Sequence, residues 1–415
     1  MQRALPSLAL LLAACGSSPS DPPDAGQARP DTGTIPDAGT IPDAGSMDAA
    51  ALDLGVDAGT IPDAGEAPDV PTFPDAGGPL DPARQNLGNW TWIPVPSSVC
   101  RDGSPTGIGV KLKPGATRLF VYLDAGGACF NAQTCGNNVD RYGSAELQAW
   151  ARGAGNAGLF SNQPANLLAS WNQVLVPYCT GDVHGGSASN KDVPGGPAGQ
   201  QFVGHQNVER GVALLKEAFG GGLAQVVLAG SSAGAFGTFL NYGTLAEAFA
   251  PLPVTLIADS GPLLRDDQAL APCLEQTWVD LWGINDGLPA GCAACRSATG
   301  QGLEALPRYY ADTYASARFG LVSSQEDAII RQFFGFGSNS CGAFQIVPAP
   351  SYSTALADLR DNVLVPTGKW STYFAPGDGH VFLREPEIRN TSVGGTPLTT
   401  FLRDVIEGRI SQVAP

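Results

Sequence analysis

Short apolar runs alternate with longer amphipathic segments through the last three quarters of the chain. Apolar residues recur at three- and four-residue steps in the segments between the runs, which is the helical period. The runs predict strands at 119–123, 174–178, 226–229, 254–258, 319–322 and 372–374, and the segments predict helices at 206–219, 235–250, 326–334 and 398–406. This alternation predicts an α/β fold with a mostly parallel sheet and helices on both faces.

The first fifteen residues have a different pattern. A basic residue, Arg3, precedes the apolar run 8–12, and small residues follow up to Cys15. The run is too short to span a bilayer as a helix, so residues 1–15 are predicted to be an export signal. The segment before Cys15 resembles the lipobox of bacterial lipoproteins, which implies a lipid on that cysteine and, with Gly16 beside it, anchoring to the outer membrane. The alternative is an ordinary secretory signal with an incidental cysteine.

Residues 16–85 form a repeat of Asp-Ala-Gly, often preceded by Ile-Pro, with almost no aromatic residues. They hold 13 acidic and 2 basic residues, and so −11 of the net charge of −16. A Pro/Gly/Asp repeat with high net charge cannot bury a core, and it predicts an extended, disordered linker. Calcium binding by the repeated aspartates is the alternative, but it lacks the dense ligand spacing of known loops. An acidic, exported chain is not expected to bind nucleic acid.

Residues 86–415 are long enough for one large domain. Eight cysteines lie in it, at 100, 129, 135, 179, 273, 292, 295 and 341. An even number in an exported chain predicts disulfides, up to four, among 105 connectivities that sequence does not resolve. The alternative for Cys292 and Cys295 is half of a metal site, which no second pair or nearby histidine completes. We therefore expect neither a metal nor an organic cofactor.

A glycine-flanked serine follows the run 226–229 directly. The segment 230–234, Gly-Ser-Ser-Ala-Gly, matches the G-x-S-x-G signature of a strand-to-helix turn that exposes a nucleophile. Strand and helix pass close together in such a turn, so the positions two before and two after the serine tolerate no bulk. Ser232 is thus the candidate nucleophile of a serine hydrolase. The alternative is a Gly/Ser-rich turn without chemistry.

A serine nucleophile needs a base, and the chain has only three histidines. His380 lies in a glycine-rich loop after the last predicted strand, where sites of parallel sheets form, and it follows Ser232 as hydrolase chain order requires. His184 also follows a predicted strand and is the alternative base. His205 precedes a predicted helix and is expected to help cap it.

The carboxylate that orients the base should lie between Ser232 and His380 at the end of another strand. Asp327 and Asp259 both fit this expectation, with Glu326 a more distant candidate. Either aspartate could instead be a helix cap or a turn residue. Spacing alone leaves the choice open.

An oxyanion hole needs two or more preorganised amides. One is expected from Ala233, the residue after the nucleophile, and the other from the glycine-rich loop 123–129, which follows the strand 119–123. The alternative is that Asp-Ala-Gly in this loop only repeats the linker motif. No strand precedes the linker copies, however, and one precedes this copy.

Taken together, these motifs resemble the pectin acetylesterases and Notum carboxylesterases, a family with a serine α/β-hydrolase fold. The resemblance covers most of residues 86–415 and rests on the segments 126–131, 171–173, 178–182, 202–204, 230–234 and 258–261 and on His380. It implies Ser232 as nucleophile, His380 as base, Asp327 as acid, and the amides of Gly127, Ala128 and Ala233 as the oxyanion hole. It also implies that Asp259 belongs to a structural or pocket motif.

The family resemblance implies a carboxylic ester hydrolase acting on O-acyl groups, with acetyl esters of a polysaccharide such as pectin as the leading substrate. Two departures bear on the acyl group: Ala128 stands where relatives carry a bulky residue, and the region 333–341 matches poorly. A lipase-like esterase and a non-catalytic glycan-binding lipoprotein are the alternatives. We expect a monomer that contacts the membrane only through its lipid anchor.

Overall fold

The computed structural model describes residue 80 and the ranges 88–265, 269–296 and 302–415. The predicted signal at 1–15 with Cys15, and the predicted linker at 16–85 apart from Leu80, lie outside these residues. Leu80 is buried and packs in the core. No helix in the described ranges is long and apolar enough to cross a membrane.

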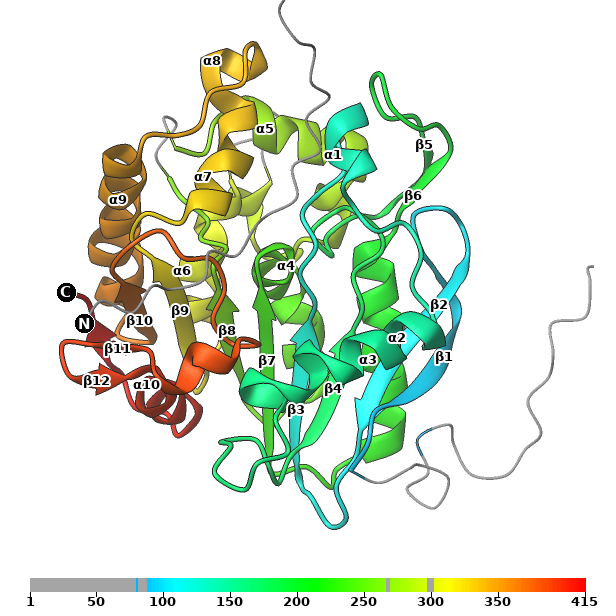
Figure 1. The fold of residues 1–415 in the computed structure, drawn as a ribbon, viewed down its shortest axis with the longest axis vertical. Coiled ribbons are helices and arrows are strands. Elements are labelled where there is room, and N and C mark those ends of the chain that lie inside the picture. Colours follow the sequence, from blue (N-terminus) through cyan, green and yellow to red (C-terminus); the bar gives the residue numbers. More distant parts are fainter. Residues whose placement is uncertain (1–79, 81–87, 266–268, 297–301) are drawn as a thin grey trace, which may run out of the picture. The chain divides into compact units, whose positions relative to one another are not determined.

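A nine-stranded sheet runs through the middle of the domain in the order β1-β2-β4-β3-β7-β8-β9-β10-β13 (Figure 1). The strands from β4 to β13 are parallel, and β1 and β2 add an antiparallel edge. Their bounds are β1 Thr91–Val99, β2 Pro105–Lys111, β3 Arg118–Leu123, β4 Asn172–Val176, β7 Gln225–Ser231, β8 Val254–Asp259, β9 Phe319–Ser324, β10 Trp370–Ala375 and β13 Gln412–Val413. The predicted mostly parallel sheet is confirmed. Two small hairpins, β5 (Ala188–Lys191) with β6 (Gln200–Phe202) and β11 (Ser392–Val393) with β12 (Thr396–Pro397), lie outside it.

Side chains of the central strands alternate between two cores, one on each face of the sheet. In β3, Leu119, Val121 and Leu123 pack in one core, whereas Phe120 and Tyr122 pack in the other. Both faces are therefore apolar, as expected for parallel strands buried between helices. The helices are α1 Ala132–Gly136, α2 Ser144–Arg152, α3 Gly204–Phe219, α4 Ala233–Ala248, α5 Pro272–Thr277, α6 Leu306–Thr313, α7 Ala328–Phe334, α8 Ser338–Cys341, α9 Ala349–Asp358 and α10 Leu398–Ile406. Apolar residues of α3 and α4 belong to the first core and those of α10 to the second, so helices cover both faces.

The antiparallel edge was not predicted from the apolar runs. Strand β1 carries Pro94 and Pro96, and β2 carries Gly107 and Gly109, so neither reads as a continuous apolar run. Proline has no amide to donate and is tolerated in an edge strand. The predicted helix 326–334 begins two residues late, at Ala328, because Asp327 is its N-cap.

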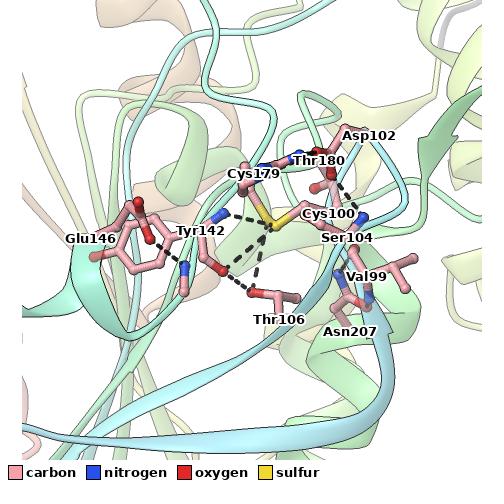
Figure 2. Close-up of a disulfide and its surroundings, with 12 residues drawn as sticks. Val99, Cys100, Asp102, Ser104, Thr106, Tyr142, Glu146, Cys179, Thr180 and Asn207 are labelled. Carbon is pink, nitrogen blue, oxygen red and sulfur yellow. Dashed lines mark hydrogen bonds and ion pairs between the residues drawn. A yellow bond between two sulfur atoms is a disulfide. The ribbon is translucent and has the colours of Figure 1, made fainter.

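All eight cysteines of the domain form disulfides, as predicted: Cys100–Cys179, Cys129–Cys135, Cys273–Cys341 and Cys292–Cys295. The alternative of half a metal site is wrong for the last pair, whose sulfurs are bonded to each other. Figure 2 shows the first bridge, where the Tyr142 amide donates to Cys100 Sγ at 3.2 Å. This bridge joins the end of β1 to the loop after β4.

Candidate active site

The polar residues singled out from the sequence follow neighbouring parallel strands. Ser232 follows β7, Asp327 follows β9 and His380 follows β10, while Asp259 ends β8 between them. Because these strands are parallel, their carboxyl ends meet at one edge of the sheet. These residues, far apart in the chain, thus lie along the same edge of the sheet.

Ser232 occupies a left-handed backbone conformation with φ 56° and ψ −120° at the start of α4. The glycines around it are required by close packing. A Cβ on Gly230 would lie 2.2 Å from the carbonyl oxygen of Gly234, and a Cβ on Gly234 would lie 2.0 Å from that of Leu123. The turn therefore has the geometry of a nucleophile elbow, in which strain holds the serine out of the regular helix.

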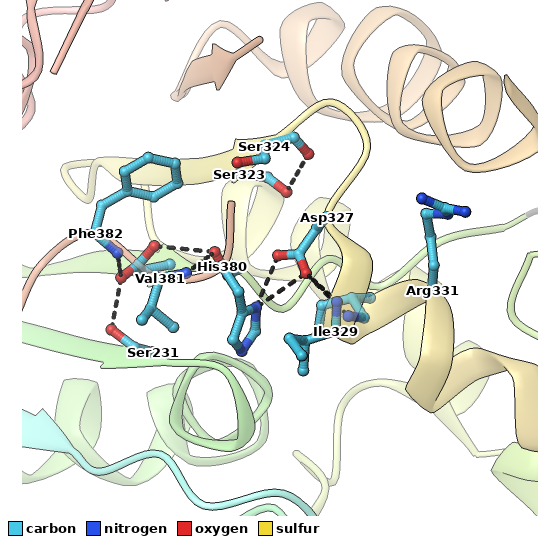
Figure 3. Close-up of polar contacts among 12 residues, drawn as sticks. Ser231, Ser323, Ser324, Asp327, Ile329, Arg331, His380, Val381 and Phe382 are labelled. Carbon is cyan, nitrogen blue, oxygen red and sulfur yellow. Dashed lines mark hydrogen bonds and ion pairs between the residues drawn. The ribbon is translucent and has the colours of Figure 1, made fainter. Parts of the chain in front are cut away.

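Asp327 and His380 are in direct contact (Figure 3). The imidazole Nδ1 lies 2.8 and 3.0 Å from the two carboxylate oxygens of Asp327. Asp327 is fully buried and also accepts hydrogen bonds from the amides of Ile329 and Ile330, at 3.0 and 2.9 Å. A carboxylate only accepts, so Nδ1 is the donor in this contact, and Nε2 takes no part in it.

Ser232 opens onto a small cavity of about 50 Å³ beside the elbow. Gly127 and Ala233 also line it, and the remaining walls are the apolar side chains of Val183, Phe236, Ile329, Ile330 and Phe333. Ile329 and Ile330 belong to the first turn of α7, directly after Asp327. The cavity thus joins the elbow to the helix that carries the acid.

Of the three residues expected to supply the oxyanion hole, Gly127 and Ala233 line this cavity, and Ala128 directly follows Gly127 in the chain. Gly127 has φ +75°, a left-handed conformation that suits glycine, and Ala128 is buried. Within the described ranges, no residue accepts a hydrogen bond from the amides of Gly127, Ala128 or Ala233. Ala233 is the first residue of α4, whereas Gly127 and Ala128 lie in the loop after β3. Unpaired amides beside a serine are suited to binding a developing negative charge.

The other two histidines lie outside this arrangement. His184 Nε2 bonds to the carbonyl of Asp124 at 2.9 Å, and its ring packs 4.7 Å from that of Tyr178. Burial lowers the pKa of His184 to about 4, so the ring is neutral at pH 7. His205 bonds through Nδ1 to Asn241 at 2.7 Å, and the first amide of α3, that of Gly204, donates to Asp182 Oδ2 at 2.7 Å. The expected capping role of His205 is therefore wrong.

The other acid candidates also have different partners. The Asp259 carboxylate accepts hydrogen bonds from Ser231 and from two amides of the loop after His380. The Glu326 side chain is exposed. The structure thus pairs the His380 ring with Asp327.

Sequence reasoning missed one ion pair next to the site. Arg384 Nη1 lies 3.2 Å from Asp124, which directly follows β3, and so ties the loop after His380 to the glycine loop. Burial raises the pKa of Asp124, and the Arg384 charge opposes that rise. The only sequence signal was an aspartate at a strand end, which many turns share.

Comparison with known proteins places this site in a family. The family model named Pectinacetylesterase matches residues 87–334, more than half of the chain. Palmitoleoyl-protein carboxylesterase NOTUM of Homo sapiens is 32% identical over 183 residues, which cover 41% of this chain and 36% of that protein. An inactive palmitoleoyl-protein carboxylesterase, notum1b of Danio rerio, is 33% identical over 102 residues, 24% of this chain and 73% of that protein.

The structural comparison agrees with the sequence comparisons. The crystal structure of the Wnt deacylase Notum from Drosophila superposes with a TM-score of 0.58 at 20% identity, covering 79% of this chain and 95% of that one. At this identity the likeness concerns the fold, which is that of an α/β hydrolase. The chain spans about a third of the length of the human relative. On the extent of the family match, the chain belongs to the pectinacetylesterase family of carboxylic ester hydrolases.

Proposed function

We propose that this protein is a serine carboxylesterase that works through an acyl-enzyme intermediate. Ser232 attacks the ester carbonyl while His380 Nε2 takes the hydroxyl proton, and Asp327 stabilises the imidazolium that forms. The amides of Gly127, Ala128 and Ala233 bind the oxyanion. His380 then returns the proton to the leaving alcohol, and water releases the acid by the same steps.

The observation that carries this proposal is the contact between His380 Nδ1 and the buried Asp327 carboxylate, at the strand edge where the Ser232 elbow lies. A structural ion pair alone would explain neither the strained serine nor the unpaired amides beside it. Family membership supports the same reaction class.

The size of the cavity supports a short acyl group. The cavity volume is about 50 Å³, far below the roughly 300–1,000 Å³ of pockets that hold drug-sized ligands. An acetyl group fits this space and a long fatty acyl chain does not. We therefore propose acetyl esters as substrates, carried by a polysaccharide such as pectin, which is the substrate that the family name indicates.

The test combines active-site labelling with turnover. The purified domain is treated with a fluorophosphonate probe and with p-nitrophenyl acetate, alongside Ser232→Ala and the control Ser316→Ala, an exposed serine before β9. We expect labelling and hydrolysis by the parent and the control, and neither by Ser232→Ala. Equal turnover by Ser232→Ala would refute the mechanism. Glycan binding without acid release would favour the non-catalytic alternative, for which the inactive relative is a precedent.

We further propose that the chain is exported and anchored by a lipid on Cys15. Four disulfides support export, because such bonds persist in oxidising compartments. Metabolic labelling with a radioactive fatty acid tests the anchor. We expect label and membrane fractionation in the parent, and loss of both in Cys15→Ser.

A further inference from the structure

One buried carboxylate beside the proposed triad has no part in the mechanism described so far. Asp259 ends β8 and pairs in register with Ser231 of β7, the residue before the nucleophile. Its side chain is fully buried. A buried charge is costly unless it is satisfied by hydrogen bonds, so its partners indicate what it is for.

The partners of this side chain lie in the loop that follows His380. Asp259 Oδ2 accepts hydrogen bonds from the amides of Phe382 and Leu383, at 2.8 and 3.0 Å, and from Ser231 Oγ at 2.6 Å. Figure 3 shows Ser231 and Phe382 on this side of His380. Two of the three donors on this oxygen belong to the loop and the third to β7, so the Asp259 side chain ties the loop after His380 to the strand before the nucleophile.

Ser260 extends the same contact by one residue. Its hydroxyl donates to Asp259 Oδ1 at 3.2 Å and accepts the amide of Val381 at 3.1 Å. The three amides after His380 are thus all bound by two consecutive residues at the end of β8.

The backbone at this contact is strained. Val381 has φ 59° and Ser260 has φ 62°, both left-handed, and a β-branched residue such as Val381 is a marked outlier there. Strain of this kind costs on the order of 1–3 kcal/mol and persists only where surrounding contacts enforce it. The hydrogen bonds from 259 and 260 supply that enforcement, directly after the proposed base.

The same residue also holds the nucleophile. The backbone carbonyl of Asp259 accepts the amide of Ser232 at 2.8 Å. We infer that Asp259 is a positioning residue, which fixes the His380 loop through its carboxylate and the Ser232 elbow through its carbonyl and so sets the distance between base and nucleophile. This inference rests on the proposed roles of Ser232 and His380.

The first test separates the side chain from the carbonyl, which no substitution removes. We expect Asp259→Ala to lower kcat by about 100-fold with KM within about twofold, because small misplacements of catalytic groups have effects of this size. Asp259→Asn keeps an oxygen for the loop amides, and its amide can face Ser260, so it should restore kcat to within about tenfold of the parent. Unchanged kcat in Asp259→Ala would overturn the inference.

A double-mutant cycle distinguishes positioning from general destabilisation. If Asp259 acts through His380, Asp259→Ala should cause no further loss of kcat in a His380→Ala background, because groups that act as a unit are not additive. A full, additive 100-fold loss there would overturn the inference. The control is Tyr242→Phe, which removes a buried hydrogen bond of 2.9 Å to Val254 at the opposite end of β8. It should lower the unfolding temperature and leave kcat unchanged.

Two further arms keep the result decisive. If Asp259→Ala does not fold, Ser260→Ala is used instead, because it keeps the Asp259 carboxylate and removes only the acceptor for the Val381 amide. We expect a severalfold loss of kcat in this variant. In the His380→Ala background, Ser260→Ala should cause no further loss. Fluorophosphonate labelling of Ser232 is followed throughout. If the parent is labelled and the Asp259 and Ser260 variants keep the parent kcat, the positioning role is refuted and the proposed function stands. If the parent is not labelled, the proposed function itself is refuted.

Discussion

His184 shows how a residue can be a plausible base by sequence and still be unsuited to the role. It follows a strand as His380 does, but its Nε2 is bonded to a backbone carbonyl and burial lowers its pKa to about 4. A base of so low a pKa would bind a proton weakly at neutral pH. The difference arises from what surrounds each ring, which a sequence does not display.

The lowered pKa of His184 predicts a pH dependence of stability. Between pH 6.5 and 4 the unfolded chain binds a proton at this residue and the folded chain does not, so the free energy of unfolding falls as pH falls through that window. The contribution approaches about 3 kcal/mol at pH 4. We expect His184→Asn, which tolerates the left-handed backbone at this position (φ 57°), to be less stable at pH 7 but to lose less on acidification.

Urea unfolding of both proteins at pH 7, 6, 5 and 4 measures this difference. The buried carboxylates of Asp124 and Asp182, whose pKa values burial raises, act in the opposite direction, but they are present in both proteins and cancel in the comparison. If the free energies of unfolding of the two proteins changed in parallel with pH, the lowered pKa of His184 would be contradicted.

At the scale of elements, the N-cap residue of α7 combines two tasks. Asp327 caps the helix by accepting two amides and, in the proposed mechanism, orients the His380 ring. The alternatives considered from sequence, helix cap or catalytic acid, were therefore not exclusive. The amides at a helix N-terminus favour a side-chain oxygen as their acceptor, so one aspartate can serve both tasks.

Asp327→Asn is expected to separate the two tasks. The asparagine oxygen can still cap α7, so the free energy of unfolding should fall by no more than about 1 kcal/mol. Its amide group cannot accept the Nδ1 proton in the same way, so kcat for p-nitrophenyl acetate should fall by about 10³–10⁴-fold. Thermal unfolding and steady-state kinetics measure the two effects, and a fall in kcat below tenfold would argue against Asp327 as the orienting acid.

The same helix also supplies a wall of the cavity beside Ser232. Phe333 lines the cavity, whereas the next residue, Phe334, points into the core and is 1% exposed. We expect Phe333→Ala to enlarge the cavity and to shift the preference among p-nitrophenyl esters from acetate towards hexanoate, by about tenfold in relative kcat/KM.

Phe334→Ala is the matched control for that shift. It should cost about 3–5 kcal/mol of stability, as buried phenylalanines do, without changing the order of preference. A parent enzyme that prefers long esters, or a Phe333→Ala variant with an unchanged profile, would show that the acyl group binds elsewhere.

Elements with strong patterns were predictable from the sequence, and those with weak ones were not. The run 226–229 and the helix after it were recognised because a buried strand and a helical period are local signals. Strand β1 was missed because its prolines break the pattern, and they are tolerated only because it is an edge strand. The left-handed turns at Ser260 and Val381 have no local signal in the sequence either. Val381 is held by a hydrogen bond to Ser260, which lies over a hundred positions away in the chain.

At the scale of the whole molecule, the chain order of Ser232, Asp327 and His380 was predictable, but their convergence depends on the strand order. The structure places β7, β8, β9 and β10 side by side and parallel, which puts their carboxyl ends in register. The choice between Asp259 and Asp327 came from family resemblance alone. Physically it depends on which carboxylate faces the ring, and spacing along the chain does not contain that information.

The disulfides allow stability and activity to be separated within one molecule. Cys100 and Cys179 are 79 residues apart, whereas Cys129 and Cys135 are 6 apart. Loop-closure entropy predicts that replacing the first pair with alanines costs about 4 kcal/mol of stability and the second about 2 kcal/mol, because the longer loop constrains the unfolded chain more.

Activity should follow the opposite order. The short bridge starts one residue after Ala128 and fixes the loop that carries the proposed oxyanion amides, so its loss should lower kcat by about tenfold. The long bridge, Cys100–Cys179, does not include a residue of the glycine loop. The loop keeps its hydrogen bond from the Cys129 amide to the Gly181 carbonyl, at 2.7 Å, when this bridge is removed. Loss of the long bridge should therefore leave kcat within about twofold. Guanidinium unfolding and p-nitrophenyl acetate kinetics on the two double variants test this. If the less stable of the two double variants also had the lower kcat, the short bridge would contribute only to stability. The loop with the proposed oxyanion amides would then be held by its hydrogen bonds alone.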